Sequence, residues 1–152
     1  MANTYTQIYI HVIFAVEARQ NILPESHKEE IHKYMAGIVR NQGQKLIAIN
    51  TMPDHAHLLM GLKPNMPLSD LVRDVKSDSS VFINGKGWIR GKFRWQEGFG
   101  GFSCGQSQLS AVVEYIRNQE SHHRKKTFKD EYLAFLRRYK IEYDEKYVFH
   151  EN

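Results

Sequence analysis

The stretch YTQIYIHVIFAV, residues 5–16, sets the architecture that we expect for this chain. It is a mostly apolar run of aromatic, Ile and Val residues, and it contains neither Gly nor Pro. Such a run is typical of a strand that is covered on both faces. We therefore predict that it forms the centre of a sheet.

Helix and strand signals follow this run in a regular order. The capping-box spacing of Ser26 and Glu29 predicts the start of a helix, and Gly43 predicts its end. We then expect strands over 45–51 and 56–62, a helix beginning at Pro67, a hairpin within 85–105 that turns at Glu97 and Gly98, a helix from Ser107, and a helical piece over 131–139. This order predicts an α+β fold of the ferredoxin-like split βαβ type, with an antiparallel sheet, helices on one face, and a further C-terminal helical segment.

Length and composition indicate one folded domain. A chain of 152 residues suits a single domain over 1–152, and 41% hydrophobic with 25% charged residues is ordinary for a globular protein. No stretch is long and apolar enough to cross a bilayer, and the first residues lack a secretory pattern. Cys104 is the single cysteine, which fits a reducing compartment, so we expect a cytoplasmic protein with no membrane partner.

Positive charge gathers in two regions of the sequence. The net charge is +4, a mild excess that permits a nucleic-acid partner. Cations beside aromatic residues between 86 and 95, and a second basic run after Gln119, are what a phosphate backbone with accessible bases requires. The alternative is a solvated face beside core aromatics. We expect DNA contacts, weakened steeply by salt, from Arg90, Lys92, Arg94, Arg124, Lys125 and Lys126.

Two histidines could share a metal ion. His55 and His57 are two residues apart in an apolar run that reads as a strand, so both rings leave on the same face while Ala56 points the other way. For an isolated His-x-His, the alternative is one buried core histidine and one at a strand end.

A polar pair on a predicted helix is the second candidate. Tyr115 and Gln119 are four residues apart and share a helix face beside the apolar side that carries Ile116. The alternative is a tyrosine at the edge of the core beside a surface glutamine.

These residues together resemble a known family. His55-Ala56-His57 followed by Tyr115-x-x-x-Gln119 is similar to the pattern of the single-tyrosine HUH transposases of the insertion-sequence-200-like family. The segments HVIFAVEARQ, MPDHAHLLMGLKP, RWQEGFGGFSC and YIRNQESHHRKKTFKDEY also look like that family, so the resemblance covers nearly the whole chain. A lone HUH is weak support, whereas its combination with a helical Tyr-x-x-x-Gln in so short a chain is strong.

The resemblance implies roles for these residues within one HUH transposase domain. His55, His57 and Gln119 would hold a divalent metal, Mg²⁺ or Mn²⁺, although two imidazoles and an amide oxygen suit Mn²⁺ better. Tyr115 would attack a DNA phosphate, keep the 5′ phosphate and release a 3′ hydroxyl. Rejoining would need no ATP, and no GxxxxGK[ST] loop is present.

The resemblance also implies partners. The substrate would be single-stranded DNA with hairpin ends, and the protein would be a homodimer in which the tyrosine helix can dock against the metal site of the other subunit. A domesticated nuclease that cuts genomic palindromes, a non-catalytic nucleic-acid-binding module and a metal-dependent hydrolase are the alternatives.

Three neighbouring side chains have less defined roles. Asp54 either orients an imidazole or serves as a turn residue after Pro53. We expect His122 and His123 to be structural or phosphate-contacting residues, with His122, seven residues after Tyr115, as the alternative addition to the site.

Overall fold

The protein is built on a four-stranded antiparallel sheet, seen here in a computed structural model that describes residues 4–123, 126–144 and 148. The strand order is β2-β3-β1-β4, in which every neighbouring pair is antiparallel. The strands are β1 (Ile8–Ala15), β2 (Lys45–Met52), β3 (His55–Leu62) and β4 (Gly100–Cys104). This confirms the predicted α+β fold of the ferredoxin-like type and the central position of the first strand.

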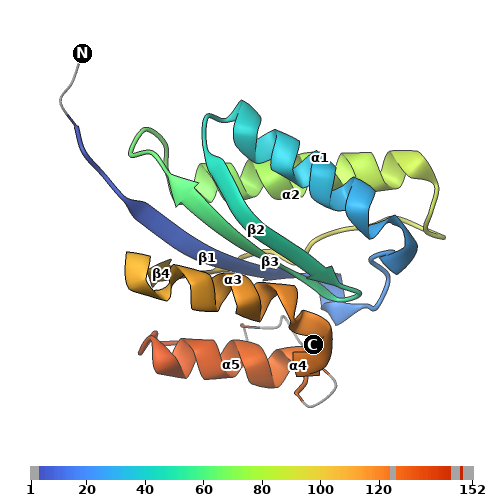
Figure 1. Cartoon of the computed structure of the whole chain (residues 1–152). Helices are drawn as coiled ribbons and strands as arrows, with labels where there is room; N and C mark the ends of the chain where they lie inside the picture. Colours follow the sequence, from blue (N-terminus) through green and yellow to red (C-terminus); the bar gives the residue numbers. More distant parts are fainter. Residues whose placement is uncertain (1–3, 124–125, 145–147, 149–152) are drawn as a thin grey trace.

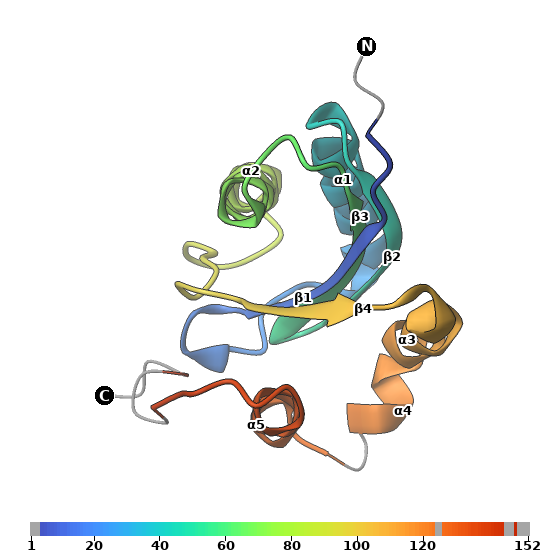
Figure 2. The same ribbon diagram turned by 90° about the vertical axis from the view of Figure 1, so that its left-hand side faces the viewer.

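Helices lie on both sides of the sheet, as Figures 1 and 2 show. One layer holds α1 (Lys28–Asn41) and α2 (Leu68–Lys86). The C-terminal segment forms the other layer, with α3 (Leu109–Arg117), α4 (Gln119–His123) and α5 (Phe128–Arg138). Short 3₁₀ turns at Glu17–Arg19, Glu25–His27 and Gln106–Gln108 connect these elements. None of the helices in the described ranges has the length and hydropathy needed to span a membrane.

The residues of β1 alternate between two cores, which explains its apolar sequence. Val12 and Phe14 pack with α1 and α2, whereas Ile13 and Ala15 pack with residues of α5. All four are at most 3% exposed, so each face of the strand removes apolar surface from water. The C-terminal helices therefore complete a second core instead of extending into solvent.

The predicted hairpin within 85–105 does not form, because both of its arms lie along β1. Trp95 forms a β-bridge with Val16, and the backbone N–H of Gln96 donates to the carbonyl of Ala15 at 2.8 Å. Gly98 has φ +84°, a left-handed conformation that glycine adopts without strain, and β4 begins two residues later. The edge of β1 thus pairs with both segments, and this prediction was wrong.

The predicted third helix is broken at Asn118, which has φ −96° and ψ 24°. The buried amide of Asn50 on β2 donates to the carbonyl of Ile116 at 2.8 Å and to that of Arg117 at 3.4 Å. These bonds satisfy carbonyls that a helix end leaves unpaired. The break lets α4 turn so that Gln119 is fully buried.

Candidate functional site

The two histidines of the His-x-His motif lie side by side beneath the C-terminal helices. His55 pairs with Ala15 and His57 with Ile13 across the β1–β3 ladder, so both share the face covered by α5. Both are fully buried, and Ala56 packs into the opposite core. The same-face geometry expected from the spacing is therefore present.

A carboxylate from α5 meets these imidazoles. Oε1 of Glu131 lies 3.0 Å from Nε2 of His57, 3.3 Å from Nε2 of His123 and 3.7 Å from Nε2 of His55. Glu131 is 3% exposed, and the four ligand atoms all lie within 4.8 Å of one another. Three nitrogens and one oxygen thus converge on a single buried point.

The second oxygen of the same carboxylate contacts the tyrosine. The hydroxyl of Tyr115 donates a short hydrogen bond to Oε2 of Glu131, and Nε2 of Gln119 donates to that oxygen at 3.3 Å. The amide oxygen of Gln119 lies 3.3 Å from Nε2 of His55 and 3.0 Å from Nε2 of His123. All four side chains expected from the sequence are therefore brought together within one chain.

Polar partners hold the far sides of both rings. Oδ1 of Asp54 lies 2.6 Å from Nδ1 of His55, so this aspartate is both a turn residue and the partner that orients the imidazole. Nε2 of His11, on β1, lies 2.8 Å from Nδ1 of His57. Each ring therefore directs its Nε2 atom toward the cluster.

Burial and hydrogen bonding fix the charges in the site. Burial lowers the pKa of His57 to about 4, so its imidazole is neutral at physiological pH. Burial alone would raise the pKa of Glu131, but hydrogen bonds from His123 and His57 outweigh it and hold the pKa below its usual range. Burial and the charge of Glu131 raise the pKa of Tyr115. The site thus holds a carboxylate beside a neutral imidazole and a protonated phenol.

The arrangement of donors fits a divalent metal ion. Metal bonds to nitrogen and oxygen are about 2.0–2.2 Å long, so neighbouring ligands lie roughly 3.0 Å apart around an octahedral ion and roughly 3.4 Å apart around a tetrahedral one. The separations of 3.0, 3.3 and 3.7 Å around Glu131 are of this size. In addition, a neutral His55 that donates Nδ1–H to Asp54 turns the lone pair of Nε2 toward the amide oxygen of Gln119. Two facing acceptors require a proton or a cation between them.

Sequence reasoning missed three members of this site. Neither Glu131, which lies within the basic run after Gln119, nor His11 was predicted as a site residue, and His123 was expected to be structural or phosphate-contacting. His11 had a detectable signal, since it is a polar residue inside an apolar strand. Glu131 also had one, because it lies three residues after Phe128 on the apolar face of its helix.

The predicted DNA contacts fall in two places: Arg90, Lys92 and Arg94 in the segment between α2 and β4, and Lys126 between α4 and α5. Arg90, Lys92, Arg94 and Lys126 are exposed, whereas Arg124 and Lys125, like the side chain of His122, lie outside the described residues. The aromatic neighbours Phe93 and Trp95 are 0% and 8% exposed, so they are core residues and not platforms for bases. For these two rings the alternative, core aromatics beside exposed cations, is what the structure shows.

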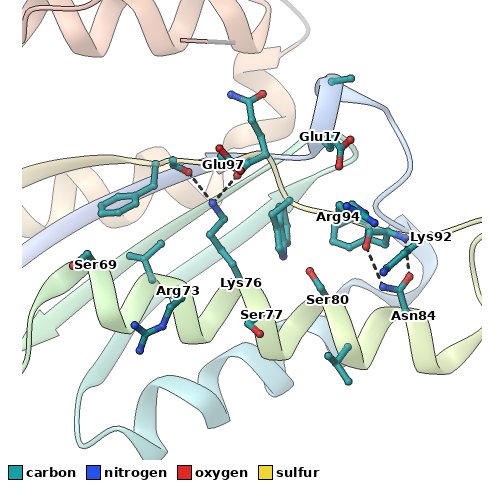
Figure 3. A pocket seen from close by; sticks show the side chains of 18 residues that line it. Glu17, Ser69, Arg73, Lys76, Ser77, Ser80, Asn84, Lys92, Arg94 and Glu97 are labelled. Atoms are coloured by element: carbon teal, nitrogen blue, oxygen red, sulfur yellow. Dashed lines mark hydrogen bonds between the residues drawn. The ribbon is translucent and has the colours of Figure 1, made fainter. Parts of the chain in front are cut away.

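Lys92 and Arg94 line a groove of about 1130 Å³ between α2 and the segment before β4. Figure 3 shows Ser77, Ser80 and Asn84 on the α2 side of this groove. Lys76 closes one part of it by donating to the carbonyls of Gln96 and Gly98 at 2.6 and 2.8 Å. Because α2 belongs to the layer opposite α3–α5, the groove and the buried cluster lie on different sides of the sheet.

Comparison with known proteins gives concordant matches. A family model described as "Transposase IS200 like" matches residues 4–119. The ISDra2 transposase TnpA of Deinococcus radiodurans is 24% identical over 118 residues, which cover 74% of this chain and 84% of the relative.

Two solved structures share the fold. A chain from Deinococcus radiodurans R1, assigned as a candidate transposase, superposes with a TM-score of 0.63 at 22% identity, over 78% of this chain and 95% of that one. A REP-associated tyrosine transposase bound to a REP hairpin superposes with a TM-score of 0.60 at 15% identity, over 81% of this chain and 73% of that one.

Proposed function

Because this chain belongs to the IS200-like transposase family, we propose that it cleaves and rejoins single-stranded DNA through a covalent bond between Tyr115 and a 5′ phosphate. The observation that carries the proposal is the contact between Tyr115 and Glu131, whose carboxylate also reaches the imidazoles. A hydroxyl beside a set of metal-ligand atoms is the arrangement that phosphoryl transfer to a protein nucleophile requires.

The proposed reaction exchanges one phosphate ester for another. The phenol oxygen of Tyr115 forms a bond to phosphorus, and the bond from phosphorus to the 3′ oxygen breaks. Oε2 of Glu131 already accepts the hydrogen bond of this hydroxyl, so it is placed to receive the proton. The departing 3′ oxygen takes up a proton from water and leaves as a 3′ hydroxyl, and Glu131 gives up its proton to water, so that no net proton is gained or lost. Attack by a 3′ hydroxyl on the phosphotyrosine reverses these steps and returns the proton to Tyr115.

We propose His55, His57 and Glu131 as ligands of a divalent metal, with His123 and Gln119 as further donors at the same point. When bound, the ion would neutralise phosphate charge and make the phosphorus more electrophilic. Glu131 is added to the set expected from the sequence, in which Gln119 was the third ligand. Mg²⁺ and Mn²⁺ were the expected ions, and three imidazoles with one carboxylate favour Mn²⁺, since Mg²⁺ prefers oxygen ligands.

We propose that DNA contacts the groove through Lys92 and Arg94 and the nearby surface through Arg90. Lys92, Arg94 and Arg90 are exposed, and serine side chains of α2 add neutral donors along the same groove. A structural relative bound to a REP hairpin supports a hairpin-bearing single strand as the ligand. We also propose contacts from Lys126, which is exposed between α4 and α5.

We also propose that two copies form a homodimer in which the tyrosine helix can dock against the metal site of the other subunit. In the described chain Tyr115 contacts Glu131 of its own chain. In a trans assembly, Tyr115 of one copy would instead contact Glu131 of the second copy.

The first prediction concerns the metal ligands. By isothermal titration calorimetry, the wild-type protein should bind Mn²⁺ more tightly than Mg²⁺. Glu131→Gln should lower the Mn²⁺ affinity roughly tenfold or more, because an amide replaces the anionic ligand, and Gln119→Ala should lower it less. Glu120→Gln, an exposed residue of α4, is the matched control. Unchanged Mn²⁺ affinity in a folded Glu131→Gln protein would show that this carboxylate is not a ligand.

The second prediction concerns the nucleophile. Incubation with hairpin-bearing single-stranded oligonucleotides and Mn²⁺ should give a protein–DNA adduct that survives a denaturing gel. Tyr115→Phe should reduce it by at least about 10³-fold, because the attacking oxygen is gone. Tyr139→Phe removes a hydroxyl that donates to the carbonyl of Ser103 and should leave the adduct unchanged. Cleavage without any adduct would instead indicate attack by water.

The third prediction tests the assembly. His57→Ala and Tyr115→Phe are each expected to be inactive alone. Mixed at equal concentration, they should restore cleavage, because one composite site would combine an intact metal centre with an intact tyrosine. A mixture that stays inactive, while co-purification of differently tagged variants shows that they form mixed dimers, would restrict catalysis to one chain.

The fourth prediction concerns the groove. The affinity for single-stranded DNA, measured by fluorescence anisotropy, should fall as salt rises. Lys92→Ala and Arg94→Ala should each reduce the slope of log affinity against log salt by about 0.7, the value for one phosphate contact to a single strand. Lys45→Ala, an exposed cation of the edge strand β2, is the control. Slopes equal to that of the wild type would remove the groove from the DNA-binding surface.

A further inference from the structure

The buried imidazole of His11 has no role in the reaction proposed above. His11 lies on β1 opposite Leu59, and Ile13 lies opposite His57. His11 and His57 are therefore diagonal neighbours on one face of the sheet. Nε2 of His11 is 2.8 Å from Nδ1 of His57, and the two residues are 2% and 0% exposed.

Both ring nitrogens of His57 have polar partners. Nδ1 faces His11, and Nε2 lies 3.0 Å from Oε1 of Glu131. A neutral imidazole carries one N–H and one lone pair, so it donates from one nitrogen and accepts at the other. An ionised carboxylate only accepts. In the described arrangement Nε2 of His57 therefore donates to Glu131, and Nδ1 accepts a hydrogen bond from Nε2–H of His11.

A metal ion at the same site needs the opposite arrangement. Coordination uses the lone pair of Nε2, so the proton of a neutral His57 must then be on Nδ1. Nδ1–H can only donate, and His11 must accept it with the lone pair of its own Nε2. Both rings must change tautomer together.

We propose that His11 is a positioning residue that reverses its hydrogen bond with His57 when a metal ion replaces the contact between His57 and Glu131. The proposal rests on the proposed function for the identity of the second state. A carboxylate in the place of His11 could only accept and a lysine could only donate, whereas the Nε2 atom of an imidazole can do either. His11 thus gives Nδ1 of the buried His57 ring a hydrogen-bond partner in both states.

The other histidine of the motif shows why this pairing is distinctive. Nδ1 of His55 faces the carboxylate of Asp54, which only accepts, so the neutral ring always has its lone pair on Nε2. The neutral His55 ring therefore has the tautomer that binds an ion at Nε2, whereas His57 can change between its two tautomers. The rings of Phe135 and Tyr115 lie edge-on to His11, with centroids 5.2 and 6.2 Å away, and keep its imidazole in place.

The protonated nitrogen can be observed directly in the whole protein. Long-range ¹H–¹⁵N correlation spectra distinguish the two tautomers of a histidine, and Zn²⁺ is a diamagnetic probe for the site. Without metal, we expect His57 to be protonated on Nε2 and His11 on Nε2. With saturating Zn²⁺, we expect both protons on Nδ1. If the spectra show the same protonated nitrogen of His57 before and after Zn²⁺ binds, the proposal is wrong.

Variants test the energetic role of the pair. His11→Phe should lower the Zn²⁺ affinity about 10–100-fold, as loss of a partner to a metal-bound histidine does. His11→Gln should recover part of it, because its amide can present either an oxygen or an N–H. Ile13→Val, a buried change on the same face, should leave the affinity unchanged. Wild-type affinity in His11→Phe would overturn the proposal.

The outcomes separate this inference from the proposed function. If Zn²⁺ binds without a change of tautomer, the proposed metal site is supported but the proposed reversal of the His11–His57 hydrogen bond is wrong. A wild-type protein that binds neither Zn²⁺ nor Mn²⁺ removes both. If His11→Phe does not fold, the wild-type spectra alone decide.

Discussion

Glu131 is an ionised carboxylate with almost no access to water, and the site depends on how its charge is satisfied. An isolated buried carboxylate costs several kcal/mol or more, so it persists only with donors around it. Here donors come from three other elements: His57 on β3, Tyr115 on α3, and Gln119 and His123 on α4. The carboxylate therefore joins the C-terminal helices to the sheet through polar contacts, beside the apolar contacts of Phe128 and Leu133.

This constraint shows which parts of the molecule the sequence could predict. The apolar run of β1 requires cover on both faces, and strand periodicity alone places His55 and His57 on the same face. Such local rules act over a few residues, so they need no knowledge of the fold. Tyr115 and Gln119 do lie close together, as predicted, but not because they share one continuous helix. The helix breaks at Asn118, yet Gln119 turns back so that its amide still lies 3.4 Å from the carbonyl of Tyr115.

The remaining members of the site depend on tertiary contacts that no local rule contains. Glu131 is 74 residues from His57 in sequence, and His11 is 46 residues from it. A glutamate on a helix rich in charged residues reads as solvated until the packing of α5 is known. The hairpin prediction was wrong for the same reason, because local sequence rules do not decide whether the segment around Trp95 pairs with β4 or with β1. The indole donates to Ser79 on α2 at 2.9 Å and packs against Phe14, and this packing favours β1.

The sheet also separates the buried cluster from the exposed cations of the groove, which need opposite environments. The cluster needs low water access, because hydrogen bonds and charge interactions strengthen where the dielectric is low. Phosphate contacts such as those proposed for Lys92 and Arg94 need exposed, hydrated cations, which reach many positions along a flexible strand. Placing cations among the imidazoles would raise the cost of holding a metal ion there. With β1 and β3 between them, the groove and the buried cluster can keep opposite electrostatic characters, and a DNA strand that reaches both must pass around the edge of the sheet.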